Sequence, residues 1–245
     1  MILLYGLIKV RENWEVNQNT ASIFTRVYCV LGGDTIYKDE KTVTKLKVNH
    51  LYCMPNLTPY QITHKKENPL ECIYFHLDIT PNIIDKLYEI DLSTDEILNY
   101  IIQTTKLCYK QKSADDLQLF IDKISEVLSL QLKQNGVIKE LGNEISGTLE
   151  FISQNYDKKI TISQISAYSG YSCEYFIKLF KKKVGISPHQ YLIAYRMKIA
   201  VKLLSQGKSI NEISNILTYS DTKNFSRAFK NYYGIKPSKF KYIKP

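Results

Sequence analysis

The stretch Ile162-Ser163-Gln164-Ile165-Ser166 returns 48 residues later as Ile210-Asn211-Glu212-Ile213-Ser214. The correspondence continues at an offset of 49, where Phe176, Phe180 and Gly185 match Phe225, Phe229 and Gly234. A period of this length indicates two copies of one supersecondary unit rather than a low-complexity segment. The two copies, within residues 162–237, determine the fold that we expect for the C-terminal part of the chain.

Each copy is predicted to be a short helix, a tight turn and a longer helix, which is the helix-turn-helix pattern. Gly170 suits the turn of the first copy, and Ser172 and Asp221 are expected to cap the longer helices of the two copies. Ser187 and Pro188 begin a connecting helix to about residue 206, which spans roughly 27–29 Å at 1.5 Å per residue. Because successive major grooves on one face of DNA lie about 34 Å apart, both longer helices can enter adjacent grooves.

The longer helices have one apolar and one polar face. Residues at i, i+3 and i+4 are predicted to face the core, namely Phe176, Leu179 and Phe180, then Phe225, Ala228 and Phe229. The opposite faces carry Glu174, Ile177, Lys178 and Lys181 in the first copy, and Lys223, Asn224, Ser226, Arg227 and Lys230 in the second. Lys, Arg and Asn reach base edges in the major groove, and Lys and Arg also neutralise phosphates. A solvated helical surface would explain one such face, but two matching faces favour DNA binding.

Charge supports the same interpretation for the C-terminal part alone. The formal net charge is +9. Residues 141–245 hold 17 Lys and Arg against 6 Asp and Glu, a balance of +11, whereas residues 1–140 hold 16 against 18, a balance of −2. Five cysteines without a C-x-x-C motif, and no recognisable signal peptide, predict reduced thiols in a cytoplasmic protein. No apolar stretch approaches the ~20 residues of a membrane span.

The N-terminal half predicts a different architecture. Short alternating or β-branched runs with turn residues between them indicate an antiparallel sandwich or barrel, with strands at 1–9, 24–31, 35–38, 41–48, 51–54, 60–64 and 71–77. Helices are predicted at 94–110 and 113–134, the second opened by a capping box at Ser113 and Asp116. One apolar face of this helix pair is either an oligomer interface or packed on the chain's own strands. We therefore expect a two-domain α+β protein, with domains 1–135 and 144–245 and a linker at 136–143, and with Asn143 capping the next helix.

Residues 144–243 resemble the DNA-binding domain of AraC/XylS-type bacterial transcription regulators. The resemblance rests on Ile210-x-x-Ile-Ser followed by Phe225-Ser-Arg-Ala-Phe-Lys-x-Tyr-Tyr-Gly-Ile-x-Pro237. It implies base-reading positions at Glu174, Ile177 and Lys178 and at Lys223, Asn224, Ser226 and Arg227, while Lys181 and Lys230 suit the phosphate backbone. The sequence departs from the family pattern in two respects. Thr218 stands in a turn where members usually have Gly, which predicts strain, and Glu174 and Ile177 are unusual readers.

Residues 20–80 resemble, more weakly, the cupin-like effector domain of the same family, through Val27-Tyr-Cys-Val-Leu-Gly-Gly33, Val48-Asn-His-Leu-Tyr-Cys-Met-Pro55 and Tyr74-Phe-His-Leu77. This implies a cupin-like β-barrel that binds a small effector, often a sugar. An apolar effector such as a fatty acid, or none, stays open. Candidate lining residues are Trp14, Tyr28, Tyr37, Tyr52, Tyr60 and His76. From the apolar faces of the two helices we expect a homodimer through 94–134, and a regulator of this type is expected to contact RNA polymerase.

Two other classes of protein compete with the regulator. A cupin-type metal enzyme fused to a DNA-binding module would need clustered His and Glu ligands, but the four histidines are scattered, no His-x-His occurs, and Tyr60 stands where a ligand His is expected. We therefore expect no metal, no cofactor and no catalysis. A general RNA-binding protein would need the aromatic-rich sheet motifs used for single-strand stacking, which the sequence lacks.

Overall fold

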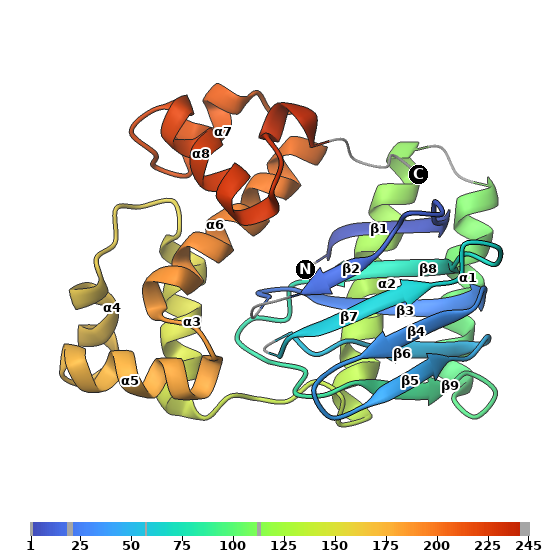
Figure 1. The fold of residues 1–245 in the computed structure, drawn as a ribbon. Helices are drawn as coiled ribbons and strands as arrows, with labels where there is room; N and C mark the ends of the chain where they lie inside the picture. The colour runs from blue at the N-terminus through green and yellow to red at the C-terminus, as the bar shows by residue number, and fades with distance from the viewer. Residues whose placement is uncertain (1, 19–21, 57, 112–113, 241–245) are drawn as a thin grey trace. The chain divides into compact units, whose positions relative to one another are not determined.

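The chain folds into two compact units, residues 1–140 and 141–244. The computed structural model describes residues 2–18, 22–56, 58–111 and 114–240, without the side chains of 114, 115 and 144. The first unit consists of strands followed by two helices, and the second is helical (Figure 1). The expected two-domain α+β class is confirmed.

The strands form two antiparallel sheets instead of the closed barrel we expected. The five-stranded sheet has the order β1-β8-β3-β6-β9, and the four-stranded sheet has the order β2-β7-β4-β5. The first consists of β1 (Ile2–Lys9), β8 (Glu71–Leu77), β3 (Thr25–Gly32), β6 (His50–Cys53) and β9 (Tyr88–Asp91); the second consists of β2 (Val16–Gln18), β7 (Tyr60–His64), β4 (Thr35–Lys38) and β5 (Val43–Leu46). β2 and β9 were not predicted from the sequence.

Three layers make up the first unit. Successive side chains of a strand point to opposite faces, so β3 sends Val27 and Cys29 to one core and Tyr28 and Val30 to another. The first core lies between the five-stranded sheet and helices α1 (Glu96–Gln111) and α2 (Ala114–Gln134), seen in green in Figure 1. The second core lies between the two sheets and is rich in tyrosine. We call it the inter-sheet core.

Helices α1 and α2 each bury one of several apolar stripes against the first core. The buried positions of α1 are Leu98, Ile101, Ile102, Thr105 and Cys108, and those of α2 include Leu117, Ile121, Ile124, Leu128 and Leu132. Other apolar residues of the two helices, among them Ile97 and Phe120, are exposed. Both helices carry apolar residues all around, so the pattern did not decide which face the sheet would cover. Ser113 of the predicted capping box lies outside the described residues.

The segment assigned as a linker is packed on the first unit up to residue 140. Val137 and Ile138 are buried in the core beneath α2. The backbone N–H of Ile83 donates to the Lys139 carbonyl at 2.8 Å, and the N–H of Lys139 donates to the Ile83 carbonyl at 2.8 Å. Lys139 Nζ also lies 2.7 Å from Asp85 Oδ2. The division between the two units therefore falls after Glu140.

The second unit consists of six α-helices and a terminal turn within its described part. They are α3 (Asn143–Asn155), α4 (Ile162–Ser169), α5 (Cys173–Val184), α6 (Pro188–Ser205), α7 (Ile210–Ile216) and α8 (Thr222–Tyr233), followed by the 3₁₀ helix η1 (Pro237–Lys239). Gly142, not Asn143, occupies the N-cap of α3, and no side chain caps it. Within the described residues, no helix has both the length and the apolar character needed to cross a membrane.

Candidate nucleic-acid interface and effector region

Each long helix of the repeat is anchored by a pair of phenylalanines. Phe176 and Phe180 of α5 are fully buried, with ring centroids 5.5 Å apart. Phe225 and Phe229 of α8 repeat the arrangement at 5.8 Å. Leu179, which we expected to complete this face, is half-buried at its margin, as is Ala228 in α8. The rotation of each helix is thus set by its two aromatic side chains.

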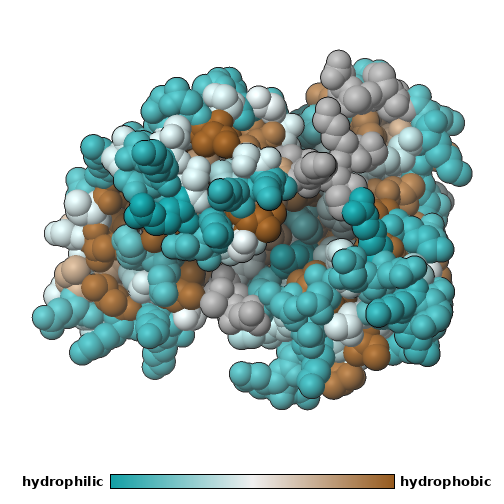
Figure 2. Space-filling view, turned by 45° about the horizontal axis from the view of Figure 1, so that its top comes forward, coloured by the Kyte–Doolittle hydropathy of each residue, from teal (hydrophilic) through white to brown (hydrophobic). Residues whose placement is uncertain are grey.

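The exposed faces of α5 and α8 carry matching rows of polar side chains. In α5 the row is Glu174, Lys178 and Lys182, and in α8 it is Lys223, Arg227 and Asn231. Residues four apart lie above one another on a helix surface, so Lys178 and Arg227 occupy the centres of the two rows. Lys181 and Lys230 are exposed at equivalent positions beside them. Hydrophilic side chains cover much of the visible surface in Figure 2.

Three exposed residues of these faces were missed in the sequence analysis. They are Tyr175, Lys182 and Asn231. A four-residue spacing from Lys178 and Arg227 would have identified Lys182 and Asn231. Ile177 and Ser226, by contrast, are half-buried at the edges of the two faces. Ile177 and Ser226 are therefore less accessible to a DNA base than the other predicted readers, which are exposed.

The helix-turn-helix turns of the two copies have the same backbone conformation with different residues. Gly170 has φ 75° and Thr218 has φ 57°. This left-handed region is readily adopted by Gly, whereas a β-branched side chain is strained there. Thr218 Oγ1 is also buried without a hydrogen-bond partner among the described residues. The strain expected from the sequence at Thr218 is present.

The start of α8 holds a hydrogen-bond network around Asp221. One carboxylate oxygen, Oδ1, accepts the backbone N–H of Asn224 at 2.7 Å, which caps the helix. The side-chain Nδ2 of Asn224 lies 2.6 Å from Ser220 Oγ and 3.1 Å from Asp221 Oδ2. Asn224, one of the predicted base readers, is therefore hydrogen-bonded to the N-terminus of its own helix. The hydrogen-bonded backbone N–H groups hold the pKa of Asp221 below its usual value.

Helix α6 connects the two copies. Its 18 residues correspond to about 27 Å at 1.5 Å per residue. Ser187 and Gln190 form a capping box at its start, with Pro188 in the first turn. Arg196 on α6 donates from Nε to the Tyr156 carbonyl at 2.9 Å and from its guanidinium to the Lys158 carbonyl at 2.8 Å. These bonds fix the connection between α3 and α4 on the connecting helix.

Most of the predicted effector-lining residues belong to the inter-sheet core. Tyr28, Tyr37, Tyr52 and Tyr60 are buried there, and Trp14 packs against them. The hydroxyl of Tyr37 donates to Asp39 at 2.9 Å, and that of Tyr52 accepts the backbone N–H of Lys47 at 2.8 Å. The rings of Tyr37 and Tyr60 stack at 5.4 Å. Tyr37, Tyr52 and Tyr60 are thus satisfied core residues in this structure.

Arg26 and His76 lie on neighbouring strands beside this core. Arg26 donates from one guanidinium nitrogen to Gln18 Oε1 at 2.6 Å and to the Tyr60 hydroxyl at 2.9 Å, and it lies over the Phe24 ring at 4.7 Å. His76 lies between Phe24 and Tyr74, with centroids 5.0 and 5.2 Å away. Burial, followed by the Arg26 charge, lowers the pKa of His76 well below its usual value. The sequence analysis did not identify Arg26.

A cross-strand pair in the four-stranded sheet presents two buried polar atoms without partners. Thr35 of β4 lies opposite His64 of β7. Within the described residues, neither Thr35 Oγ1 nor His64 Nε2 has a hydrogen-bond partner. His64 Nδ1 lies 3.0 Å from the Lys65 carbonyl, which requires a proton on Nδ1 and leaves Nε2 as an acceptor. The centroids of the Trp14 and His64 rings are 6.0 Å apart, so the His64 ring lies beside an aromatic side chain.

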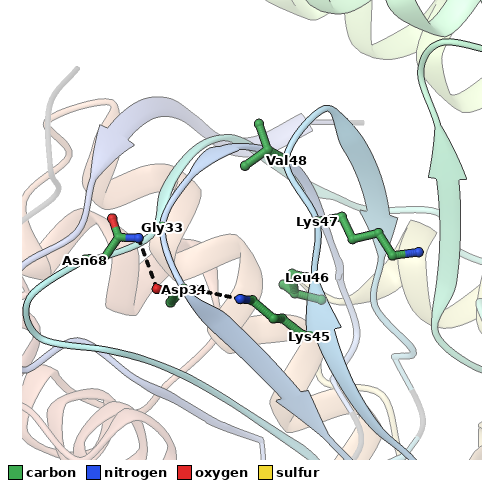
Figure 3. Close-up of a pocket in the computed structure, with 7 residues that line it drawn as sticks. All are labelled: Gly33, Asp34, Lys45, Leu46, Lys47, Val48 and Asn68. Carbon is green, nitrogen blue, oxygen red and sulfur yellow. Dashed lines mark hydrogen bonds and ion pairs between the residues drawn. The ribbon is translucent and has the colours of Figure 1, made fainter.

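A separate surface pocket of about 390 Å³ opens at the turns of the strands (Figure 3). It is lined by Gly33, Asp34, Lys45, Leu46, Lys47, Val48 and Asn68. Asp34 pairs with Lys45 at 2.7 Å and accepts from Asn68 at 3.2 Å, while Lys47 points away to Glu89 at 2.7 Å. The Lys45 and Asn68 hydrogen bonds lower the pKa of Asp34. Each charged side chain that lines the pocket has an ion-pair partner, either within the lining or at Glu89, and we assign the pocket no ligand.

Known proteins match this chain over the region that contains the repeat. Residues 158–242 match a family model described as a helix-turn-helix domain. The chain is 28% identical over 174 residues to the probable transcriptional regulator LumQ of Photobacterium leiognathi, covering 69% of this chain and 63% of that protein. It is 27% identical to the lactose operon transcription activator of Staphylococcus xylosus, covering 66% of this chain and 60% of that protein. The chain thus spans less than two thirds of these relatives.

The whole chain also shares its fold with a solved structure. This is ToxT of Vibrio cholerae bound to an unsaturated fatty acid, with a TM-score of 0.65 at 13% identity, covering 98% of this chain and 94% of that chain. At this identity the likeness concerns the fold alone.

Proposed function

The helix-turn-helix domain of residues 158–242 is of the AraC type, and from this premise we propose that the protein is a sequence-specific transcription regulator. Helices α5 and α8 bind two adjacent major grooves of double-stranded DNA. The observation that carries this proposal is the pair of matching exposed rows of polar side chains, centred on Lys178 and Arg227. The rows lie on the two helix-turn-helix copies, which the helix α6 joins. A helix of about 27 Å suits grooves that lie about 34 Å apart.

The two reading helices have different roles in this proposal. Arg227, at the centre of the α8 row, reads guanine through two hydrogen bonds, and Lys223 and Asn224 contact neighbouring bases. Lys181, Lys182 and Lys230 are exposed and bind phosphates. In α5, Glu174 accepts from a cytosine amine, while Lys178 binds a base or a phosphate. Ile177 and Ser226 contribute at the edges of the faces, since both are half-buried.

The decisive experiment is selection of binding sites from random double-stranded DNA, followed by titration of the selected duplex. We expect wild-type protein to select two motifs about one helical turn apart. Arg227→Ala should lose about 1–3 kcal/mol of discrimination at one base pair, whereas Lys181→Ala should weaken all sequences alike and reduce the salt slope by about 1. If Arg227→Ala keeps both affinity and sequence preference, α8 is not a reading helix. Equal affinity for RNA would favour a general nucleic-acid binder.

We further propose that the first unit binds a small effector beside Trp14. Thr35 Oγ1 and His64 Nε2 offer one hydroxyl donor and one acceptor without partners in the described structure. Their chemistry suits a small hydroxylated molecule packed on an aromatic ring. One relative is named for the lactose operon, and the ToxT structure contains a fatty acid. The polar pair favours a hydroxylated ligand over an acyl chain.

Fluorescence tests the effector proposal directly, because Trp14 is the sole tryptophan of the chain. A panel of neutral mono- and disaccharides, with an unsaturated fatty acid as the alternative ligand, should include a sugar that changes the emission. Thr35→Val removes the hydroxyl at similar size and should weaken that sugar about fivefold to tenfold, since one hydrogen bond contributes about 1 kcal/mol. A response to the fatty acid alone would contradict the assignment.

Dimerisation through α1 and α2 is the remaining part of the proposal. Exposed apolar residues follow each helix, namely Ile97, Tyr100 and Leu107 on α1 and Leu119, Phe120, Val127 and Leu130 on α2. An exposed apolar surface of this kind is typical of a protein interface. In sedimentation experiments Val127→Glu with Leu130→Glu should yield a monomer, whereas Gln118→Lys, off this stripe, should not. A wild-type monomer at micromolar concentration would overturn this part.

We propose no catalytic activity, because the matched relatives are named as regulators. Across the described ranges, no three His, Cys, Asp or Glu side chains lie together as a metal site. The competing cupin-type enzyme predicts a stoichiometric metal in purified protein. Metal analysis therefore separates the two functions.

A further inference from the structure

Asn224 occupies the first turn of α8 with its side chain held in one orientation. Its amide nitrogen contacts two oxygens, Ser220 Oγ at 2.6 Å and Asp221 Oδ2 at 3.1 Å. Its backbone N–H donates to the other Asp221 oxygen at 2.7 Å. Asn224 is therefore joined to the helix cap both through its backbone and through its side chain.

The chemistry of the partners determines which end of the amide faces the cap. An ionised carboxylate only accepts hydrogen bonds, so the group next to Asp221 Oδ2 must be the amide nitrogen and not the oxygen. The lowered pKa of Asp221 keeps it ionised near neutral pH. The Ser220 hydroxyl lies 3.4 Å from Asp221 Oδ2 and can donate to it, which leaves a lone pair for the Asn224 amide. Both amide hydrogens are thus engaged.

The amide oxygen is the part of Asn224 left for DNA. Among the described residues, Asn224 Oδ1 accepts no hydrogen bond, and the residue is exposed. Asn usually reads adenine through two bonds, donating to N7 and accepting from the N6 amine. Without its donors, Asn224 can only accept. Adenine N6 and cytosine N4 are the major-groove donors, while guanine O6 and thymine O4 are acceptors that oppose the Asn224 oxygen.

We propose that Ser220 and Asp221 are positioning residues that make Asn224 an acceptor-only reader. The base facing Asn224 is then adenine or cytosine, tolerated about equally, and guanine and thymine are rejected. This inference rests on the proposed function, since it requires α8 to lie in a major groove. It distinguishes α8 from α5, where Tyr175 occupies the position equivalent to Asn224 and has no amide.

The first copy of the repeat supplies the variant that separates reading from helix capping. Ser172 caps α5 with a single side-chain oxygen, accepting the backbone N–H of Tyr175 at 3.5 Å. Asp221→Ser should therefore preserve the cap of α8 while removing the second oxygen that holds the Asn224 amide. Combined with Ser220→Ala, it releases both amide hydrogens. Helical circular dichroism and melting of the variant show whether the domain remains folded.

The experiment is selection from random double-stranded DNA with three full-length proteins: wild type, Asn224→Ala, and the double variant Ser220→Ala with Asp221→Ser. Asn224→Ala identifies the base pair that Asn224 reads, because preference is lost there and kept elsewhere. At that base pair, wild type should accept adenine and cytosine within about threefold. The double variant should prefer adenine over cytosine by about tenfold, which corresponds to 1.4 kcal/mol, because the released amide can then form two hydrogen bonds with adenine.

Three results would overturn the inference while leaving DNA binding intact. The first is a wild-type protein that selects adenine and rejects cytosine, because the amide would then have rotated to read both groups. The second is a folded double variant with wild-type preference at this base pair. The third is an Asn224→Ala protein that keeps every preference. A wild-type protein that selects no motif at all would instead refute the proposed function.

Discussion

Single residues distinguish the two copies of the repeat at their turns. Gly170 and Thr218 stand at equivalent positions, both with positive φ. For a residue with a Cβ this conformation costs about 1–2 kcal/mol, a cost that Gly avoids. Thr218 adds a buried hydroxyl without a partner in the described structure. The second helix-turn-helix is therefore less stable at its turn than the first.

We expect Thr218→Gly to stabilise the second unit by about 1 kcal/mol. Relief of backbone strain and of the buried hydroxyl exceeds the roughly 0.5–1 kcal/mol of chain entropy that Gly costs. Chemical denaturation followed by circular dichroism measures the change. Thr218→Ala is the matched control, because it removes the hydroxyl and keeps the Cβ, and should recover less. A destabilised Gly variant would show that the threonine side chain makes a favourable contact.

His76 should make the first unit less stable in mild acid. Its pKa is well below 6.5 in the folded protein because burial, and then Arg26, oppose its charged form. The unfolded chain therefore binds a proton near pH 6.5 that the folded chain does not bind, and stability falls as pH decreases below that value, by at most about 1.4 kcal/mol per pH unit. Denaturation monitored by Trp14 fluorescence gives the free energy of unfolding at pH 7 and at pH 5. Between these pH values His76→Gln should lose less stability than the wild type. An identical loss in both proteins would exclude His76 as the cause.

At the scale of elements, capping and aromatic anchors explain the two reading helices. Ser172 and Asp221 begin α5 and α8, and left-handed Gly185 and Gly234 end them. Buried phenylalanine pairs then rotate the same face of each helix outward. This common frame carries different chemistry, since Glu174 in α5 corresponds to Lys223 in α8. We infer that α8 contributes more to base recognition than α5.

Cys173 offers a direct test of which face of α5 meets DNA. It is the first residue of α5 and is exposed, whereas the other four cysteines are buried. A bulky maleimide should therefore label one thiol rapidly, label it more slowly in the presence of bound DNA, and prevent DNA binding once attached. Cys173→Ser should bind DNA normally and resist both effects. Unimpaired binding by labelled protein would place this end of α5 away from DNA.

At the scale of the whole molecule, the connection between the units belongs structurally to the first. Val137 and Ile138 fill the core beneath α2, and Lys139 pairs with the backbone of Ile83. The buried side chain of Asn56 holds the neighbouring residue Ile84, because its Oδ1 accepts the backbone N–H of Ile84 at 2.8 Å. The loop at 80–87 is therefore joined by hydrogen bonds both to Asn56 and to the last residues of the first unit.

Val137→Ala should destabilise the first unit by about 1–3 kcal/mol, as expected for two buried methyl groups. Lys139→Ala removes a surface ion pair with Asp85 and should cost less than about 1 kcal/mol. Trp14 fluorescence reports unfolding of this unit for both variants. If Val137→Ala is as mild as Lys139→Ala, then residues 136–140 do not form part of the core.

The local features of this protein could be predicted from the sequence. The repeat, the caps at Ser172, Ser187, Ser209 and Asp221, the glycine turns and seven of the strands depend on residues close together in the chain. The same applies to the strain at Thr218 and to the row centres Lys178 and Arg227. Hydrogen bonding and helical periodicity over a few residues are enough to determine them.

Only the tertiary structure decided which of several possible contacts form between distant residues. Helices α1 and α2 are apolar on more than one side, so packing against the five-stranded sheet determined which face is buried. Val137 and Ile138 are packed because strands and helices from distant parts of the chain form the core that encloses them. Tyr37, Tyr52 and Tyr60 are core residues because strands from three parts of the chain bring them partners. The orientation of Asn224 needed the structure for another reason. Its partners Ser220 and Asp221 lie only four and three residues before it, but the backbone conformation of the turn decides whether they meet its amide.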